Sequence, residues 1–371
     1  MKKNDWVRVF LLLSLYLLVL FIFKRDIFYF KFDNKLIDRY FLSQDITHEV
    51  PGKRLFLSDE DIYLSTGYLY VNGADPSEYN FEHPPVIKYL FGLSIYLFNN
   101  PYVVQVILGG LLLTTFYFIT KNITKKSTIA FIACLFLIFD PLFLDLSAQP
   151  LLDLGQTLFM LLYFVSIFYL RENFILQGLL LALFAGSKFW ITPIFFVTTF
   201  YGYKIYIKQF NWKYFFLQLL SAFIFYSLFY TQTFILKSGH FNIIWHILKT
   251  FKYRVDHNTS SIFGASLILF LTGYFKSWWG RGEIIRILTW SLMWPIGLLS
   301  TLIRSLIGLK KGLISLNLLV TVIPIVYLLY LGVQAPFPRY FMIILPFIYL
   351  VLAENIFALY KKIDKHKSIA A

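Results

Sequence analysis

The residues best suited to chemistry lie in one polar stretch of an otherwise apolar chain. Residues 24–100 hold 11 of the protein's 20 acidic side chains in a fifth of its length. Asp59 and Glu60 are adjacent in this stretch, and His83 and Lys88 lie on either side of a later pair of prolines. A carboxylate within reach of a hydroxyl can act as a general base, and a cation can neutralise an anionic leaving group. Because charge is costly beside lipid and tends to mark chemistry there, we place the active site in this stretch.

Two later cations extend this chemistry. Lys188 lies between two apolar stretches and is followed by two aromatic residues, and Arg339 follows a proline-rich break. A cation at the edge of the bilayer can bind a phosphate, and the planar fork of an arginine fits a phosphate better than a lysine does. Among the later cations, Arg339 is therefore the first that we would mutate.

Simpler explanations exist for each of these residues. The acids of residues 59–61 can be solvated loop residues, and Lys88 can direct its ammonium to ordinary lipid headgroups. Lys188 can be an interface anchor, and Asp153, at the start of a predicted helix, can simply favour the positive end of the helix dipole. The residues alone leave these alternatives open.

The histidine and cysteine content gives no sign of a metal centre or a disulfide. No two of the six histidines have the i, i+4 spacing of a helical metal site, and Cys134 is the single cysteine. We therefore expect no cofactor, although a divalent cation stays compatible with the sequence. The net charge of +14 does not indicate nucleic acid, because residues outside 24–100 carry a net +17 spread over short connectors.

The composition predicts a membrane protein. The chain is 58% hydrophobic with a mean hydropathy of +0.66, and its length of 371 residues fits a single membrane domain of about ten helices, residues 1–371. We expect an all-α polytopic fold with a large first external loop that carries interfacial helices. The predicted helices are 7–23, 101–120, 127–144, 151–170, 174–187, 191–207, 213–232, 286–306, 313–332 and 338–358.

The distribution of lysine and arginine predicts the orientation of the chain. Threading the helices alternately through a membrane places the basic connectors and both termini on the cytoplasmic side, and residues 24–100 and 233–285 outside. Helix 7–23 lacks a following cleavage site and is expected to be retained. The agreement requires that two short apolar stretches, 87–98 and 262–275, do not cross, as their length favours.

Three motifs of the first external loop resemble a known family. The order of the motifs is Asp59-Glu60, then Gly-x-Asp-Pro at 73–76, then His-Pro-Pro-x-x-Lys at 83–88. This order resembles the protein O-mannosyltransferase family of the GT-C glycosyltransferase superfamily, in its prokaryotic type. Later matches are Leu-Leu-Asp ending at Asp153, a Lys-Trp element at 188–190 and Arg339-Tyr340. Residues 147–150 depart from the family, which has an arginine a few residues before the Leu-Leu-Asp.

The resemblance implies an inverting, metal-independent transfer of a sugar from a polyprenyl-phosphate donor to a hydroxyl. Mannose is the sugar that the resemblance favours. Asp59 is then the general base, and Glu60 orients the acceptor or supports Asp59. The residues implied to bind the donor and its phosphate are His83, Lys88, Asp153, Lys188, Arg339 and Tyr340.

The same resemblance implies an enzyme integral to the plasma membrane, with its active site outside and protein Ser or Thr as acceptor. A related GT-C transferase that modifies lipids or cell-surface glycans is an alternative, as is a glycan ligase or polymerase. A transporter or flippase without chemistry is the alternative from another class. Transporters tend to place their binding groups near the bilayer midplane in two related halves, whereas this chain concentrates its charge in one early loop.

Overall fold

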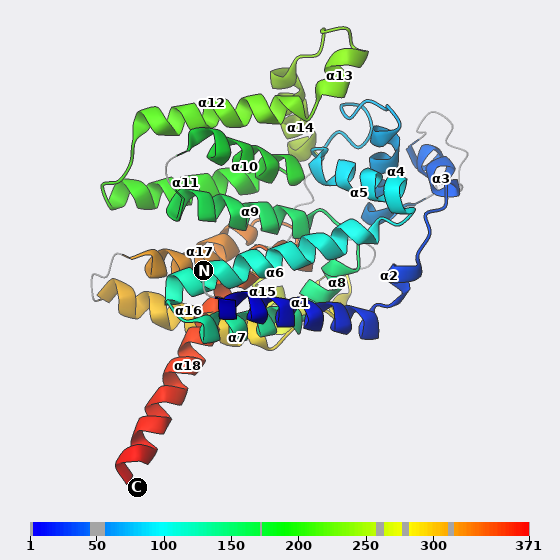
Figure 1. The fold of residues 1–371 in the computed structure, drawn as a ribbon. Coiled ribbons are helices and arrows are strands. Elements are labelled where there is room, and N and C mark those ends of the chain that lie inside the picture. The colour runs from blue at the N-terminus through cyan, green and yellow to red at the C-terminus, as the bar shows by residue number, and fades with distance from the viewer. Residues whose placement is uncertain are drawn as a thin grey trace.

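The protein is a bundle of helices in a computed structural model that describes residues 3–44, 56–170, 173–256, 263–276, 282–310 and 315–370 (Figure 1). The earlier elements are α1 (Lys3–Phe23), α2 (Asp26–Tyr29), α3 (Lys35–Gln44), α4 (Asp59–Val71), α5 (Val86–Phe98), α6 (Tyr102–Thr124), α7 (Ser127–Ile138), α8 (Pro141–Ser147) and α9 (Asp153–Phe168). The later elements are α10 (Phe174–Ser187), α11 (Ile191–Tyr206), α12 (Trp212–Leu228), α13 (Thr231–Leu236), α14 (Ile243–Asp256), α15 (Ala265–Thr272), β1 (Tyr274–Lys276), β2 (Ile284–Arg286), α16 (Met293–Lys310), α17 (Leu316–Leu331), the 3₁₀ helix η1 (Pro338–Phe341) and α18 (Leu345–Ala370).

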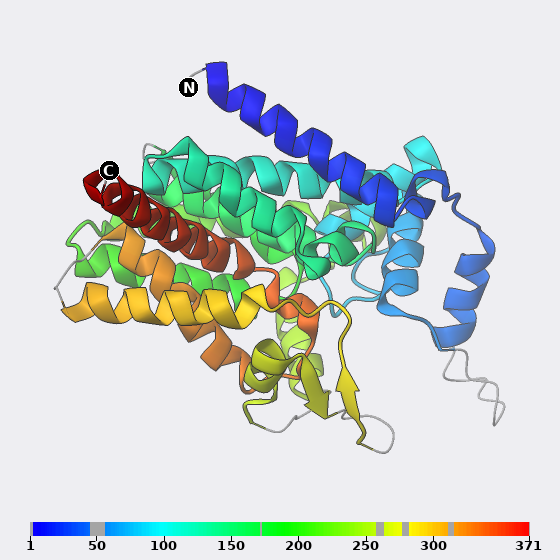
Figure 2. The same ribbon diagram turned by 90° about the horizontal axis from the view of Figure 1, so that it is seen from below.

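The long helices form two groups, which meet where α6 of one group packs on α9 of the other. Helices α9, α10, α11 and α12 lie side by side, with α10 packed on both α9 and α12 (Figure 1). On the other side, α6 packs on α7, and α7 packs on α1 and α18. Helices α3, α4 and α5 gather at one end of the bundle, and the start of α1 and the end of α18 lie at the opposite end (Figure 2). The first loop is therefore a cap on one end of the bundle.

The apolar helices support a membrane protein. Within the described residues, Asn4–Phe23 and Tyr102–Thr124 are long and apolar enough to cross a bilayer. Helices α7 and α8 pass the same test only as a pair, which is bent by 69°. Other apolar helices, such as α9 and α10, have 10–17 residues. The predicted number of ten crossings and the predicted orientation therefore stay predictions.

The bend between α7 and α8 interrupts the predicted helix 127–144. Pro141 cannot continue α7, because it lacks the N–H that the helix needs, but it fits the first turn of a new helix. Asp140 caps that helix by accepting hydrogen bonds from the backbone N–H groups of Leu142 and Phe143. Its second oxygen accepts hydrogen bonds from Trp294, at 2.8 Å, and from the hydroxyl of Tyr349.

A small hairpin corrects the all-α prediction and the predicted start of the helix 286–306. Of residues 262–275, residue 262 lies outside the described part, and α15 covers only Ala265–Thr272 before β1 begins. Strand β1 pairs with β2 in antiparallel register, Phe275 opposite Ile285. Helix α16 therefore begins at Met293 and not at residue 286 as predicted. The predicted helix 313–332 is found as α17, with residues 313 and 314 outside the described part.

Two other predicted helices are divided. The range 213–232 becomes α12 and the start of α13, and the range 338–358 becomes η1 followed by α18. The range 87–98, which we did not count as a crossing, is the 13-residue helix α5.

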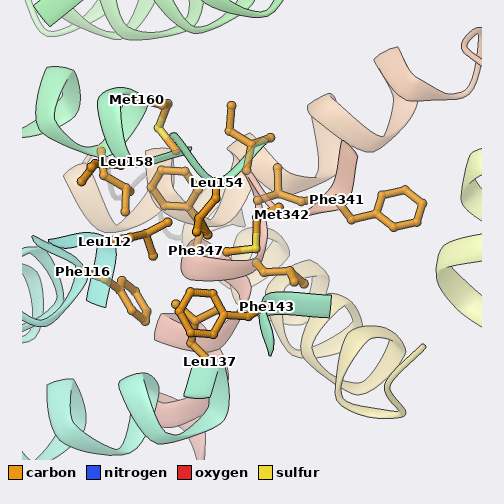
Figure 3. Packing of buried hydrophobic residues seen from close by; sticks show 14 of the residues in the cluster. Leu112, Phe116, Leu137, Phe143, Leu154, Leu158, Met160, Phe341, Met342 and Phe347 are labelled. Carbon is orange, nitrogen blue, oxygen red and sulfur yellow. The ribbon is translucent and has the colours of Figure 1, made fainter. Parts of the chain in front are cut away.

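The core joins both groups of helices. Leu112 and Phe116 of α6 face Leu137 of α7, Leu154 of α9 and Phe347 of α18 (Figure 3). All five are buried. Contiguous burial of such side chains stabilises the packing of helices on each other.

Two glycines allow α4 and α5 to cross at close range. A Cβ atom on Gly92 would lie 2.0 Å from the carbonyl oxygen of Gly67, and one on Gly67 would lie 2.4 Å from the carbonyl oxygen of Lys88. No side chain can be placed at such distances. The two backbones therefore contact each other, which fixes the start of α4 relative to α5.

Candidate active site

A polar cavity of about 230 Å³ lies where distant segments of the chain meet. Its wall is formed by the start of α9, the junction of α10 and α11, the last turns of α14 and α17, and η1. The predicted site residues that line it are His83, Asp153, Lys188, Arg339 and Tyr340. The fold thus collects five side chains that four separate stretches of sequence contribute.

Asp153 holds two cations in this cavity. It is the first residue of α9, and its buried carboxylate accepts a hydrogen bond from the ammonium of Lys188. The Nε atom of Arg339 lies 4.0 Å from the second carboxylate oxygen. Lys188 follows α10, where the backbone becomes extended, and its ammonium lies 4.4 Å from the centre of the Tyr340 ring. Burial lowers the pKa of Lys188 to about 8, against the opposing effect of Asp153.

Asp59 reaches the cavity through Arg339. The side chain of Ser58 accepts a hydrogen bond from the backbone N–H of Asp61 and so caps α4, which places Asp59 in the first turn. An Nη2 donor of Arg339 lies 2.6 Å from Oδ2 of Asp59. The side chain of Asp59 is 46% exposed and that of Arg339 only 18%. The carboxylate of Asp59 is therefore accessible to an incoming group, and its partner Arg339 lines the cavity.

Arg254, on the last turn of α14, is a cavity residue that the sequence argument missed. Its guanidinium donates to the imidazole ring of His83, and it lies 5.5 Å from the centre of the Phe189 ring. Burial, together with the charge of Arg254, lowers the pKa of His83 well below its ordinary value, so His83 is a neutral acceptor. The amphipathic pattern of residues 243–256 is the signal that could have placed Arg254 on a helix.

Lys88 is not among the residues that line the cavity. Its ammonium is fully buried and donates to the hydroxyl of Tyr70 at 2.9 Å and to the backbone carbonyls of Asn80 and His83 at 2.8 and 2.7 Å. All of these acceptors belong to the first loop. The structure therefore places Lys88 as the residue that holds the loop around His83, in place of the direct phosphate contact that we expected.

Glu60 is also outside the cavity lining. It follows Asp59 on α4 and faces Asp145, whose carboxylate lies 2.9 Å from the ammonium of Lys24. Burial, with a further contribution from the charge of Asp145, raises the pKa of Glu60. Glu60 thus lies beside the predicted base, in an environment that favours its protonated form.

Three buried donors of the cavity residues have no hydrogen-bond acceptor within the described chain. They are the Nε atoms of Arg254 and Arg339 and the amide nitrogen of Gln156. Gln156 lies one turn after Asp153 on the same face of α9, and this i, i+3 polar pair in an apolar helix was an unused sequence signal. Leaving a buried N–H unpaired is costly, so the three donors point to an anionic or polar ligand.

An apolar groove of about 400 Å³ adjoins the cavity. Helices α10, α11 and α12 line it, with Trp190 at the α10–α11 junction. The ring of Trp190 lies 5.7 Å from that of Phe251, which lines the polar cavity. A ring that lines the apolar groove therefore packs on a ring that lines the cationic cavity.

The described residues contain no group of three or more His, Cys, Asp or Glu side chains that could hold a metal ion. The cations of the cavity come instead from lysine and arginine. The expectation that no cofactor is required stays a prediction.

No protein-family model and no curated protein matches the sequence. Solved structures that match the fold include two of ArnT. ArnT from Cupriavidus metallidurans bound to undecaprenyl phosphate has a TM-score of 0.62 at 12% identity, over 95% of this chain and 61% of ArnT. Its apo form has a TM-score of 0.57 at 13% identity, over 86% of this chain and 58% of ArnT.

The GT-C superfamily that the sequence motifs resemble stays a prediction. At this level of identity the likeness concerns the fold alone, and the chain spans about three fifths of the ArnT chain. The O-mannosyltransferase subtype stays a prediction.

Proposed function

We propose that the protein is a membrane glycosyltransferase that moves a sugar from a polyprenyl-phosphate carrier to a hydroxyl group. One observation carries this proposal: Lys188, Arg254 and Arg339 converge on one cavity, and Asp59 is bound to Arg339 at its edge. The unpaired N–H groups of both arginines call for an anionic acceptor, for which a phosphate is well suited. The fold likeness to ArnT bound to undecaprenyl phosphate supports the choice of a polyprenyl phosphate.

In the proposed reaction, the carboxylate of Asp59 takes the proton of the acceptor hydroxyl while the hydroxyl oxygen attacks the anomeric carbon of the sugar. The bond between the anomeric carbon and the phosphate oxygen breaks, and polyprenyl phosphate leaves with the bonding electron pair. Lys188, Arg254 and Arg339 stabilise the negative charge that develops on the phosphate. A single displacement of this kind inverts the anomeric configuration.

The remaining predicted residues have supporting roles in this proposal. Asp153 accepts a hydrogen bond from Lys188 and lies 4.0 Å from Nε of Arg339, and so helps to keep both cations in the cavity. His83, as a neutral acceptor, orients Arg254. The ring of Tyr340 lies beside the ammonium of Lys188 and limits its motion.

The apolar groove between α10, α11 and α12 is the proposed place for the hydrocarbon tail of the donor. It ends beside the cationic cavity, so a lipid can lie in the groove while its phosphate reaches Lys188 and Arg254. Apolar surface that is buried by such a tail contributes to affinity in proportion to its area.

Mannose as the sugar and protein Ser or Thr as the acceptor rest on the motifs of the first loop. Asp59-Glu60 and the His-Pro-Pro-x-x-Lys run at 83–88 are the parts that resemble the protein O-mannosyltransferases. A lipid or cell-surface glycan acceptor would use the same cavity and the same base. The assay must therefore offer both kinds of acceptor.

The deciding experiment measures transfer from radiolabelled polyprenyl-phosphate-mannose in membranes that contain the protein, with Ser/Thr peptides and with lipid acceptors. Asp59→Asn is expected to lower kcat by about a hundredfold or more, as loss of a general base does. Asp61→Asn, two residues further on the same helix, is the matched control and is expected to keep the parental rate. Equal rates for Asp59→Asn and the parent would remove Asp59 from its role. The absence of transfer from every polyprenyl-linked donor to every hydroxyl acceptor would contradict the proposed function.

A further inference from the structure

Helices α13 and α14 dock on the first loop through a polar contact centred on Asp75. Asp75 is 6% exposed, and its Oδ1 atom accepts hydrogen bonds from Thr233 at 2.6 Å and from the backbone N–H of Ser77 at 2.8 Å. The ammonium of Lys237 lies 3.3 Å from its Oδ2 atom. The contact with Thr233 joins residues that are 158 positions apart in the sequence.

A second group of contacts reinforces the docking on either side of Asp75. The side-chain amide of Gln232 donates to the backbone carbonyl of Ala74 at 2.5 Å, and its oxygen accepts from the hydroxyl of Tyr89 at 3.2 Å. On α14, the ammonium of Lys249 lies 4.1 Å from the centre of the Phe81 ring. Figure 1 shows α13 and α14 beside α4 and α5.

The far end of α14 carries Arg254 into the cavity, where it donates to His83. The opposite face of α14 is exposed and apolar, with Ile244 and Trp245 at 58% and 70% exposure. Besides the packing of His246 on Tyr230 and of Phe251 on Trp190, the position of Arg254 therefore depends on the face of α14 that contacts the first loop. Asp75 is the buried charge of the first loop that contacts Thr233 and Lys237, the segment that leads into α14.

We propose that Asp75 is a positioning residue that docks α13 and α14 on the first loop and so places Arg254 at the phosphate of the donor. This role rests on the proposed function for its effect on binding, but not for its effect on the docking itself. Glu78 lies at the same 3.3 Å from Lys237 but is 58% exposed, so solvent replaces its contact when it is lost. Asp75 has no such replacement, because its loss leaves Thr233 and Lys237 without their buried partner.

The first test measures binding of undecaprenyl phosphate by the purified full-length protein in detergent. Asp75→Asn is expected to weaken binding by about tenfold, and Arg254→Gln by at least as much. The double variant is expected to bind no more weakly than Arg254→Gln alone, because Asp75 acts through Arg254. Losses that multiply in the double variant, or parental binding by Asp75→Asn, would overturn the proposal.

The second test follows the docking without any lipid. Spin labels at the exposed positions Asn72 and Lys252, in a Cys134→Ala background, report the distance between the first loop and α14. Asp75→Asn is expected to broaden the distance distribution. An unchanged distribution in a folded Asp75→Asn protein would contradict the docking role.

Two further variants complete both tests. Lys237→Gln changes a partly exposed residue and keeps the docking testable if Asp75→Asn does not fold; it is expected to reproduce the broadening, and Lys237→Arg to restore the parental distribution. Glu78→Gln is the matched control and is expected to behave as the parent in both tests. A parent that binds no undecaprenyl phosphate would count against the proposed function, and the spin-label distances would still decide the role of Asp75.

Discussion

Replacement of Arg339 by glutamine is the most informative single change. Its Nη2 atom lies 2.6 Å from Asp59, and its Nε atom lies 4.0 Å from the buried carboxylate of Asp153 and has no hydrogen-bond acceptor among the described residues. A hydrogen bond to a charged group contributes about 1.5–3 kcal/mol. If the phosphate of the donor fills the free position on Nε, one such contact is lost in the variant. That loss corresponds to a fall of about ten- to a hundredfold in kcat/KM.

The cost to stability is expected to be smaller than the cost to activity. Asp59 is 46% exposed, and pairs of this kind contribute about 1 kcal/mol or less. The buried Asp153 keeps Lys188 as its partner. Thermal unfolding in detergent, measured alongside transfer from the polyprenyl-linked donor, separates the two effects.

Arg304→Gln provides the matched control. Arg304 pairs with Glu354 at 2.8 Å, between α16 and α18, and it does not line the cavity. We expect this variant to keep the parental kcat/KM with a similar small loss of stability. If Arg339→Gln also kept the parental kcat/KM and donor affinity, the assignment of the cavity as a phosphate site would be wrong.

Two further predictions concern the lysines. Because burial lowers the pKa of Lys188 to about 8, its ammonium is charged below that pH, and donor binding is expected to weaken about tenfold per pH unit above it. Lys188→Arg should abolish this alkaline loss, and an identical pH profile in parent and variant would show that Lys188 does not bind the donor. Lys88→Met should lower the free energy of unfolding by about 3 kcal/mol, because buried acceptors on Tyr70 and His83 lose their donor. The free energy of unfolding is measured by denaturation. If it is unchanged in this variant while donor binding is abolished, Lys88 would instead be assigned to the phosphate.

The sequence predicted most of the helices because long apolar runs with basic connectors have few other interpretations. It failed where a short apolar run is ambiguous. Residues 262–275 have the composition of a buried helix, but Gly264 and Gly273, with φ of +81° and +77°, flank α15 and limit it to eight residues. The chain then forms β1 and β2, which shortens the predicted helix at 286. Hydropathy does not record such backbone conformations.

The candidate site was predictable in its residue types and not in its geometry. Asp153, Lys188 and Arg339 are charges in apolar surroundings, which is a strong signal in a membrane protein. The direction of a side chain leaves no such signal. Lys88 faces the inside of its own loop, and Arg254 belongs to a helix that hydropathy alone does not distinguish from a loop.

The ion pair between Asp59 and Arg339 also has a consequence for the order of events during synthesis. Arg339 is made 280 residues after Asp59, in the last segment before α18. In a ribosome-bound chain from which Asp59 has already emerged, Arg339, its ion-pair partner, is therefore still missing. On this basis we expect the nascent protein to complete its site only when translation is nearly finished. Every fragment that stops before η1 should be inactive in the transfer assay.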